Sequence, residues 1–278
     1  MKRSILISAL VAGLSLPLLS QATDFKPEPI ARAEEVKIRS AVLNEERELR
    51  ISKPRSYDQS QASYPVLYVL DADLNFHVTA EIVRYLSAYS LIPEMLVVGV
   101  TNTDRNRDMT PNKPKEEGAR LATAGGAGNF LKFLGDEAIP FIEKSYRAQP
   151  DRTIVGHSLS GLLAVHALLA RPDLFSTYIA ISPALWWNKF EYFDKIQAYY
   201  QSHPSLKKAL YVSLADESER DPAVYTRLQD ALTKSAPKDL NVQVQFFKQE
   251  NHISTAIVSV TNALLKLFPV QSANRPSQ

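Results

Sequence analysis

Apolar and polar positions along the second half of the chain alternate between two patterns. Short apolar runs of strand length are each followed by a longer segment with apolar positions at helical spacing. The predicted strands are 152–155, 177–181, 209–214 and 242–248, and the helices predicted after them are 159–170, 190–201, 222–234 and 254–268. Strands that alternate with helices predict a mostly parallel sheet with helices on both faces.

The first half of the chain predicts a hairpin and two further strands. Residues 35–42 and 47–53 alternate apolar and polar positions on either side of the tight connection LNEE, which is typical of an antiparallel hairpin. The runs PVLYVLD (65–71) and MLVVGVT (95–101) predict buried strands, and a helix is predicted between them at 76–89. An N-terminal hairpin and about eight strands in all fit the α/β-hydrolase fold.

Two further segments complete the predicted domain. A polar loop at 102–128 is unusually long, and loops of this length inside compact domains are usually functional or mobile. Residues 129–146 predict a helix that Pro140 kinks, because proline donates no backbone hydrogen bond. We expect a single α/β domain over 30–270, followed at 271–278 by a polar tail that is predicted to be disordered.

The first residues have the pattern of a secretory signal peptide. Lys2 and Arg3 give a positively charged start, 5–19 is apolar but too short for a membrane span, and SQA, ending at Ala22, has small residues at both positions that signal peptidase recognises. We expect a signal peptide at 1–22 and export to the periplasm; the alternative is an uncleaved membrane anchor. No later segment of the sequence predicts a membrane-spanning helix.

Composition narrows the functional classes. The chain has 278 residues, of which 45% are apolar and 22% are charged, with a net charge of +2. The apolar fraction is enough for a sizeable core. The small net charge predicts neither a basic face for nucleic acid nor an acidic tail. The absence of cysteine excludes a thiol nucleophile, a disulfide framework and a cysteine-ligated metal. We expect a small-molecule substrate and neither a metal nor an organic cofactor.

The segment TIVGHSLSGLLAVHALLA (153–170) places Ser158 at the turn between a strand and a helix. This is the position of the nucleophile in the G-x-S-x-G turn of α/β-hydrolases, which holds the hydroxyl out of the sheet beside a helix N-terminus. Gly156 precedes it, Ser160 stands where the pattern has glycine, and Gly161 follows; we interpret Ser160 as a tolerated small residue. The alternatives are Ser158 as an ordinary helix N-cap and Ser160 as the nucleophile.

A serine nucleophile needs a general base, and in this fold the chain order is serine, acid, histidine. His252, in FFKQENHIS, lies just after the last predicted strand, where the fold delivers its base. The other histidines precede the serine, adjoin it, or lie in or after helices, and they are His77, His157, His166 and His203. We predict that His252 is the base; the alternative is a solvated loop histidine.

The acid that orients the base is expected at the end of the strand before the last one. The segment LYVSLADESERD offers carboxylates at Asp216, Glu217, Glu219 and Asp221. Asp216 and Glu217 are nearest the strand end and are the two candidates. The others are interpreted as members of a solvated acidic loop.

Backbone groups at two turns are the candidates for an oxyanion hole. One donor is the N–H of Leu159, directly after the predicted nucleophile, and the second comes from LDADLNF, the loop after the third strand. In that loop the N–H of Ala72 or Asp73 is the candidate. The side chain of Asp71 is predicted to brace the loop rather than to take part in the chemistry.

Five motifs together carry a family resemblance: YPVLYVLDAD, VVGVTNTDRNRDMTP, GHSLSGLLAVHALL, SPALWW and ENHIST. From 36 to 268 the chain resembles the esterase D group of α/β-hydrolases, and more closely its exported bacterial branch, which includes siderophore esterases of the enterobactin and salmochelin type. The resemblance implies Ser158 as nucleophile and His252 as base. It implies Glu217 as the acid by its spacing from Ala215, although some members of the branch work with serine and histidine alone.

Two of these motifs bear on substrate binding. SPALWW follows a predicted strand and places Trp186 or Trp187 either beside the pocket or in the core. DRNRDMTP holds Arg105, Arg107 and Asp108, which either form an ion pair that anchors the long loop or, for Arg105, contact the substrate.

The function predicted from these residues is an exported serine hydrolase that cleaves carboxylic esters through an acyl-enzyme. The alternatives are an acyltransferase on the same fold and triad, and a non-catalytic binding protein on a hydrolase scaffold. Short acyl esters, aromatic esters and siderophores all remain candidate substrates. A siderophore needs cationic partners, which Arg105, Arg107 and Arg120 can supply, although Glu116 and Glu117 lie in the same loop.

Overall fold

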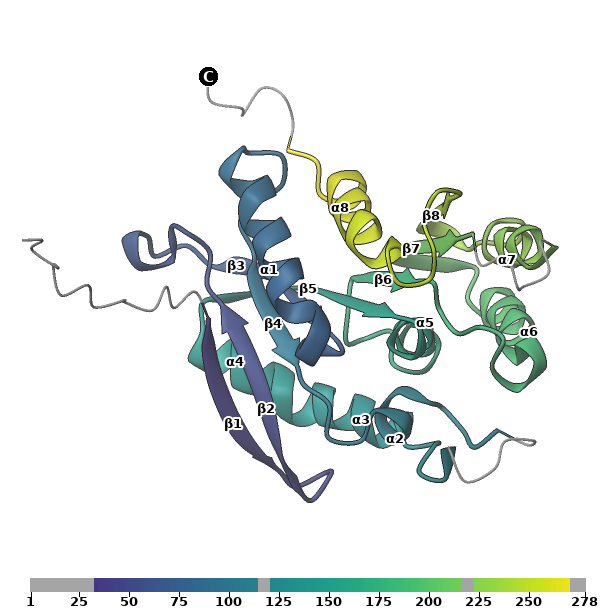
Figure 1. The fold of residues 1–278 in the computed structure, drawn as a ribbon, viewed down its shortest axis with the longest axis horizontal. Helices are drawn as coiled ribbons and strands as arrows, with labels where there is room; N and C mark the ends of the chain where they lie inside the picture. The colour runs from purple at the N-terminus through teal and green to yellow at the C-terminus, as the bar shows by residue number, and fades with distance from the viewer. Residues whose placement is uncertain (1–32, 115–120, 217–222, 271–278) are drawn as a thin grey trace, which may run out of the picture. The chain divides into compact units, whose positions relative to one another are not determined.

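A computed structural model describes residues 33–114, 121–216 and 223–270, which are built around one sheet (Figure 1). The sheet has eight strands in the order β1-β2-β4-β3-β5-β6-β7-β8. Their bounds are β1 (Glu34–Ser40), β2 (Glu45–Ser52), β3 (Tyr64–Val69), β4 (Leu96–Val100), β5 (Ala148–His157), β6 (Thr177–Ile181), β7 (Ser205–Ala215) and β8 (Lys238–Phe247). β1 pairs with β2 and β2 with β4 in antiparallel register, and the other pairs are parallel. The predicted α/β-hydrolase fold with its N-terminal hairpin is confirmed.

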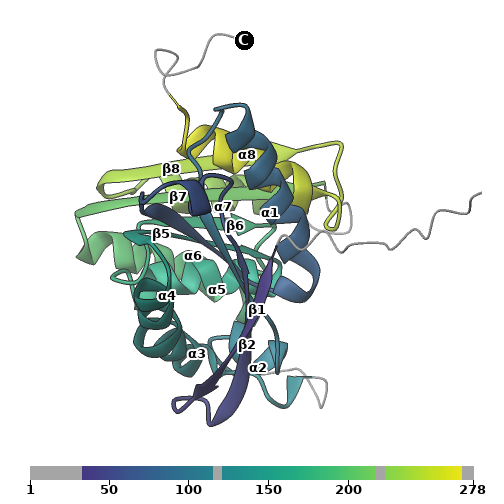
Figure 2. The ribbon, with the colours of Figure 1, turned by 90° about the vertical axis from the view of Figure 1, so that its left-hand side faces the viewer.

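Helices cover both faces of the sheet (Figures 1 and 2). Their bounds are α1 (Ala72–Ala88), α2 (Arg105–Met109), α3 (Ala127–Phe133), α4 (Ile139–Ser145), α5 (Leu159–Ala170), α6 (Trp187–Ser202), α7 (Ala223–Thr233) and α8 (Thr255–Leu267), with a short 3-10 turn, η1, at Tyr57–Gln59. Apolar side chains of α1 and α8 form one core cluster with the sheet. Those of α3 to α7 form a second, larger cluster on the other face.

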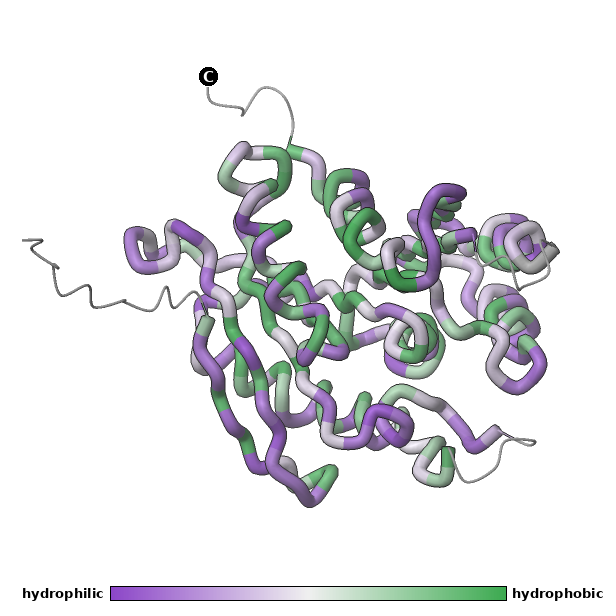
Figure 3. The backbone as a smooth tube through the Cα atoms, viewed as in Figure 1, coloured by the Kyte–Doolittle hydropathy of each residue, from purple (hydrophilic) through white to green (hydrophobic). Residues whose placement is uncertain are grey.

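The central strand β3 shows why its sequence is continuously apolar. Leu67 and Val69 belong to the cluster under α1 and α8, whereas Val66 and Tyr68 belong to the cluster on the opposite face. Successive side chains of a strand point to opposite faces, so a strand covered on both faces needs apolar residues at every position. Figure 3 shows these hydrophobic runs along the central strands, with mixed colouring in the helices around them.

The helix after β3 begins earlier than predicted. The prediction placed it at 76–89, but α1 starts at Ala72. Asp71, immediately before it, adopts a left-handed conformation with φ of 51° and ψ of 44°. Its carbonyl oxygen accepts hydrogen bonds from the N–H groups of Leu74 and Asn75, both at 3.0 Å. The chain therefore passes from strand to helix within a single turn, without the expected loop.

The long segment after β4 also contains more structure than predicted. The short helix α2 lies within the predicted loop 102–128. The helix predicted at 129–146 is interrupted by a π-helical turn, η3 (Leu134–Ala138), between α3 and α4. Pro140 lies in the first turn of α4, where its missing N–H costs least. The helix is therefore interrupted near Pro140, as predicted. The interruption is a π-helical turn just before the proline rather than a kink at it.

Several predictions fall outside the described residues. They are the signal peptide at 1–22, the tail at 271–278, the loop residues Glu116, Glu117 and Arg120, and the acid candidates Glu217, Glu219 and Asp221. Within the described ranges, no helix combines the length and the apolar character needed to cross a membrane.

Candidate active site

Ser158 occupies a sharp turn between β5 and α5. Its backbone has φ of 63° and ψ of −117°, a conformation that costs free energy for any residue except glycine. Three hydrogen bonds hold it there. The Ser158 N–H donates to Ile181 O at 3.0 Å, and its carbonyl accepts from the N–H groups of Leu162 at 2.9 Å and Ala184 at 3.0 Å. This is the strained strand-to-helix turn predicted from the sequence.

Two glycines allow the strand and the helix to approach at this turn. A Cβ atom at Gly156 would lie 2.2 Å from Ser160 O, and one at Gly161 would lie 2.9 Å from Ile181 O. Both distances are too short for a side chain, so positions 156 and 161 require glycine. The side chain of Ser160 fits beside them and is fully buried. The turn therefore accommodates a serine where the usual pattern has glycine, and the burial of Ser160 argues against it as the nucleophile.

The predicted base lies beside the turn. His252 is in the connection between β8 and α8, and its ring centroid is 4.7 Å from that of His157, the residue before Ser158. His157 Nε2 donates a hydrogen bond of 2.7 Å to the carbonyl oxygen of His252, since a carbonyl can only accept. Burial lowers the pKa of the His157 imidazole, and the neighbouring His252 lowers it further. A neutral His157 therefore fixes the His252 backbone next to the nucleophile turn.

The connection that carries His252 is also held by its own side chains. Asn251 Oδ1 accepts hydrogen bonds from the N–H groups of Ile253 at 2.9 Å and Ser254 at 3.0 Å. The Ser254 hydroxyl accepts one from the Asn251 N–H at 3.0 Å. These reciprocal bonds fix the backbone on both sides of His252, just before α8 begins.

The acid remains a prediction. Asp216 follows the last residue of β7 and is exposed. Its N–H donates a 3.0 Å hydrogen bond to Glu250 O, which ties the end of β7 to the connection that carries His252. Glu217, the acid that the resemblance implies, lies outside the described residues.

The predicted oxyanion donors lie at the ends of neighbouring strands. β3 pairs with β5 in parallel, and Val69 is in register with Val155. A few residues beyond that pair, each strand meets the N-terminus of its own helix, at Ala72 in α1 and at Leu159 in α5. N–H groups in the first turn of a helix have no acceptor within the helix and attract negative charge. The two predicted donors therefore share one edge of the sheet.

The carboxylate of Asp71 is enclosed by hydrogen-bond donors, and only 4% of the residue is exposed. Oδ1 accepts from Asn102 Nδ2 and Arg105 Nε, both at 2.8 Å, and Oδ2 accepts from Arg105 Nη2 at 2.8 Å and Ser160 Oγ at 2.7 Å. The bond to Asp71 raises the pKa of the Arg105 guanidinium. These contacts support the predicted bracing role. The sequence did not predict that Asn102 and Ser160 bind Asp71, because no local pattern marks contacts between such distant segments.

Comparison with known proteins identifies the family. A family model described as "Putative esterase" matches residues 40–257, which is most of the chain. The chain belongs to this esterase family. The protein is a carboxylic ester hydrolase, in agreement with the predicted enzyme class.

The relatives of this esterase include siderophore esterases. Ferri-bacillibactin esterase BesA of Bacillus subtilis is 32% identical over 240 residues, which cover 77% of this chain and 82% of that protein. The crystal structure of an IroE-like serine hydrolase from Shewanella oneidensis has a TM-score of 0.81 at 30% identity, over 85% of this chain and 80% of that one. The BES protein from Bacillus cereus has a TM-score of 0.76 at 25% identity, over 89% of this chain and 100% of that one.

The predicted ion pair of the esterase's long loop is confirmed for Arg107 and Asp108, whose Nε and Oδ1 atoms are 2.7 Å apart. Asp108 is fully buried and also binds Arg47 on β2, with 2.7 Å between Oδ2 and Nη1. Arg107 pairs with Glu45 as well, so this cluster anchors α2 to the hairpin. Arg105 pairs with Asp71 instead, but 38% of its side chain remains exposed at the edge of the site.

The two tryptophans of the esterase differ in exposure. Trp187 is 1% exposed, and its indole N–H donates a 2.7 Å hydrogen bond to Asn112 Oδ1. Trp186 is only half-buried and packs against it, with 6.0 Å between ring centroids. Trp187 therefore fastens the long loop to the core, and Trp186 is the one with surface available for a ligand.

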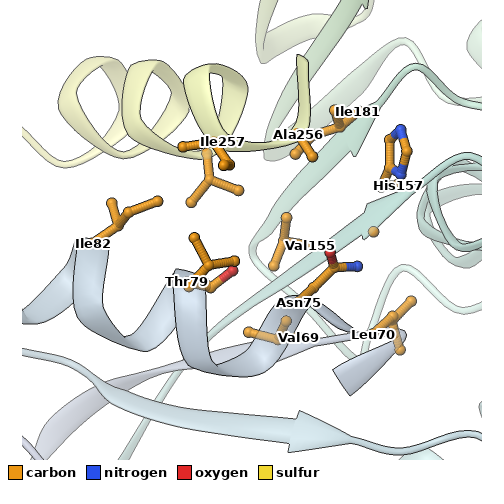
Figure 4. A pocket seen from close by; sticks show the side chains of 13 residues that line it. Val69, Leu70, Asn75, Thr79, Ile82, Val155, His157, Ile181, Ala256 and Ile257 are labelled. Carbon is orange, nitrogen blue, oxygen red and sulfur yellow. The ribbon is translucent and has the colours of Figure 1, made fainter. Parts of the chain in front are cut away.

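An apolar groove runs between α1 and α8 on the esterase, beginning beside the nucleophile turn (Figure 4). The space between its lining atoms, counted together with open solvent at its mouth, is about 330 Å³. Thr79 and Ile82 of α1 line it, together with Ala256 and Ile257 of α8, and His157 lies at one end. Its lining, among the described residues, includes no charged side chain. No pattern in the sequence predicts this groove, because it forms between helices that are distant in the chain.

Proposed function

We propose that this protein is an exported serine esterase that hydrolyses small esters, such as siderophore or other acyl and aromatic esters, through an acyl-enzyme on Ser158. The observation that carries the proposal is the backbone of Ser158, which is held at φ of 63° between a strand and a helix. Strain of this kind persists where the surrounding structure enforces it, and it is typical of functional sites. The relatives named as siderophore esterases support the substrate class.

The proposed reaction begins with attack of Ser158 Oγ on the ester carbonyl carbon, while His252 takes the hydroxyl proton. The N–H groups of Leu159 and Ala72 stabilise the oxyanion, and each such donor is typically worth roughly 100- to 1,000-fold in rate. His252 then gives its proton to the departing alcohol. In the second half His252 takes a proton from water, which attacks the acyl carbon, and it then returns that proton to Ser158 Oγ as the carboxylic acid is released. Glu217 or Asp216 orients the imidazole.

The groove between α1 and α8 suits an uncharged part of the ester. Ile82, Ile257 and the neighbouring apolar side chains offer surface for an acyl chain or an aromatic ring. The cations that the sequence suggested for an anionic substrate are compensated where they are described, Arg105 by Asp71 and Arg107 by Glu45 and Asp108. We therefore propose that the groove holds the apolar portion of the ester, next to the reacting carbonyl.

The test is a hydrolysis screen with p-nitrophenyl esters of increasing acyl length, a feruloyl ester and a catechol trilactone siderophore with and without iron. We expect ester cleavage in at least one class, abolished by Ser158→Ala. Cleavage that is unaffected by Ser158→Ala would contradict the proposal. Addition of an alcohol acceptor distinguishes hydrolysis from acyl transfer, because a transferase forms the new ester in preference to the free acid.

Export is proposed from the N-terminal pattern alone. The charged start, the apolar run and the small residues before Thr23 favour cleavage after Ala22. Mass spectrometry of the periplasmic fraction should find Thr23 at the N-terminus. A full-length product confined to the cytoplasm would contradict this part of the proposal.

A further inference from the structure

Ser160 makes specific hydrogen bonds at the position where the usual turn has glycine. Its hydroxyl oxygen accepts from the His157 N–H at 2.8 Å. The same oxygen lies 2.7 Å from Asp71 Oδ2 and 2.9 Å from His157 O. A hydroxyl carries one proton, and a carboxylate is a stronger acceptor than a carbonyl, so Ser160 donates to Asp71. Both side chains are buried, so water does not weaken this bond.

Asp71 is the residue that sets the direction of the oxyanion loop. It is held in the left-handed conformation, which is unfavourable for a residue with a side chain, and the next residue is Ala72. Its carboxylate binds Asn102 and Arg105, which both belong to the long segment after β4, and Ser160. Of these, Ser160 is the one that belongs to the nucleophile turn.

We propose that Ser160 is a positioning residue that couples the nucleophile turn to the oxyanion loop. This inference rests on the serine esterase activity proposed above. An oxyanion hole works only if its donors keep a fixed separation, within roughly 0.5 Å of the productive geometry. The donors proposed here, Leu159 and Ala72, belong to different strand-helix turns. The hydrogen bond from Ser160 to Asp71 joins these two turns directly.

Loss of the Ser160 hydroxyl leaves Asp71 with Asn102 and Arg105, which hold the carboxylate from the side of the long loop only. No other side-chain hydrogen bond described in the structure joins the two turns, so Ala72 can then shift relative to Leu159. The oxyanion forms only in the tetrahedral state, so such a shift weakens transition-state binding more than substrate binding. The expected signature is a lower kcat with a KM that stays nearly constant.

The experiment compares Ser160→Ala with a matched control, Ser40→Ala. Ser40 is also fully buried, accepts a backbone hydrogen bond from Leu43 at 2.9 Å and donates to a carboxylate, that of Glu137, but it lies at the end of β1. We expect Ser160→Ala to lower kcat roughly 10- to 100-fold, somewhat less than deletion of an oxyanion donor. Ser40→Ala should lose comparable stability and keep kcat.

A trifluoromethyl ketone inhibitor provides the second measurement, because its adduct with the serine places an oxyanion in the hole. Its inhibition constant should rise for Ser160→Ala by about the factor by which kcat/KM falls, and should not change for Ser40→Ala. Ser160→Ala should lower kcat much less in an Asp71→Asn background than in the wild type, because the bond that it removes is already weakened there.

The outcomes separate this inference from the proposed function. If Ser158→Ala is inactive but Ser160→Ala retains the kcat and inhibitor affinity of Ser40→Ala, Ser160 only fills space and the inference is wrong. If Ser158→Ala keeps full activity, the proposed function itself fails.

Discussion

Gly156→Ala offers a direct test of the packing that creates the nucleophile turn. The added Cβ atom would lie 2.2 Å from Ser160 O and 2.4 Å from Ser160 C, both backbone atoms. Real Cβ atoms essentially never approach closer than 3.0 Å, so the 2.2 Å contact is too short by 0.8 Å. The first turn of α5 must therefore move by nearly that distance, and it carries the Leu159 N–H.

A displacement of about 1 Å in a catalytic group can cost roughly 100-fold in rate. We therefore expect Gly156→Ala to lower kcat by about 100-fold on p-nitrophenyl acetate, and overpacking should destabilise the fold by about 1–3 kcal/mol. The assay measures kcat, KM and urea unfolding on the same preparation. Urea unfolding gives the fraction of the variant that is folded under the assay conditions. A fall in kcat beyond the loss of folded protein then reports displacement of the Leu159 N–H.

The matched control is Gly128→Ala. Gly128 lies in α3, and a Cβ atom there would meet nothing within 4 Å. Alanine favours a helix over glycine by up to about 1 kcal/mol, so this variant should be neutral or slightly more stable, with unchanged kcat. A Gly156→Ala protein with the activity and stability of Gly128→Ala would refute the reasoning about the turn.

Three further predictions concern the acid, the groove and acid stability. Glu217→Gln should lower turnover more than Asp216→Asn in steady-state assays; the opposite order exchanges their roles, and no effect from either indicates a serine–histidine dyad. Ala256→Trp should fill the groove and lower kcat/KM for long acyl esters while sparing the acetate, and an unchanged chain-length profile would contradict the groove assignment. Burial lowers the pKa of His166 from 6.5 to about 4. As the pH falls, His166 therefore becomes protonated in the unfolded chain before it does in the folded protein, and the free energy of unfolding declines between pH 6.5 and about 4. In urea unfolding, His166→Gln should reduce the loss of stability across that window by up to about 3 kcal/mol, and His203→Gln should not reduce it.

The sequence predicted the strands well because burial on both faces leaves a strong signal. PVLYVLD is apolar at nearly every position since its side chains enter two cores, and β6 and α5 have the predicted bounds. Ser158 stands out in the sequence for a similar reason. The turn that strains its backbone also demands small neighbours, and the glycines at 156 and 161 are visible in the sequence.

What the sequence did not predict depends on contacts between distant segments. Asp71 takes a left-handed conformation, which aspartate adopts more often than most residues, and its carboxylate is held by Asn102, Arg105 and Ser160. No local pattern encodes such a network, so the start of α1 was placed too late. The groove between α1 and α8 has the same origin, since each helix alone shows only an ordinary apolar face.

The central claim is that Ser158 is the nucleophile, and the most direct test is labelling with a fluorophosphonate followed by peptide mass spectrometry. The label should be found on Ser158 alone, and Ser158→Ala should lose both the label and roughly 10⁴- to 10⁶-fold in kcat, with substrate binding nearly intact. A label on Ser160, or a Ser158→Ala protein that hydrolyses p-nitrophenyl acetate near the wild-type rate, would contradict the account.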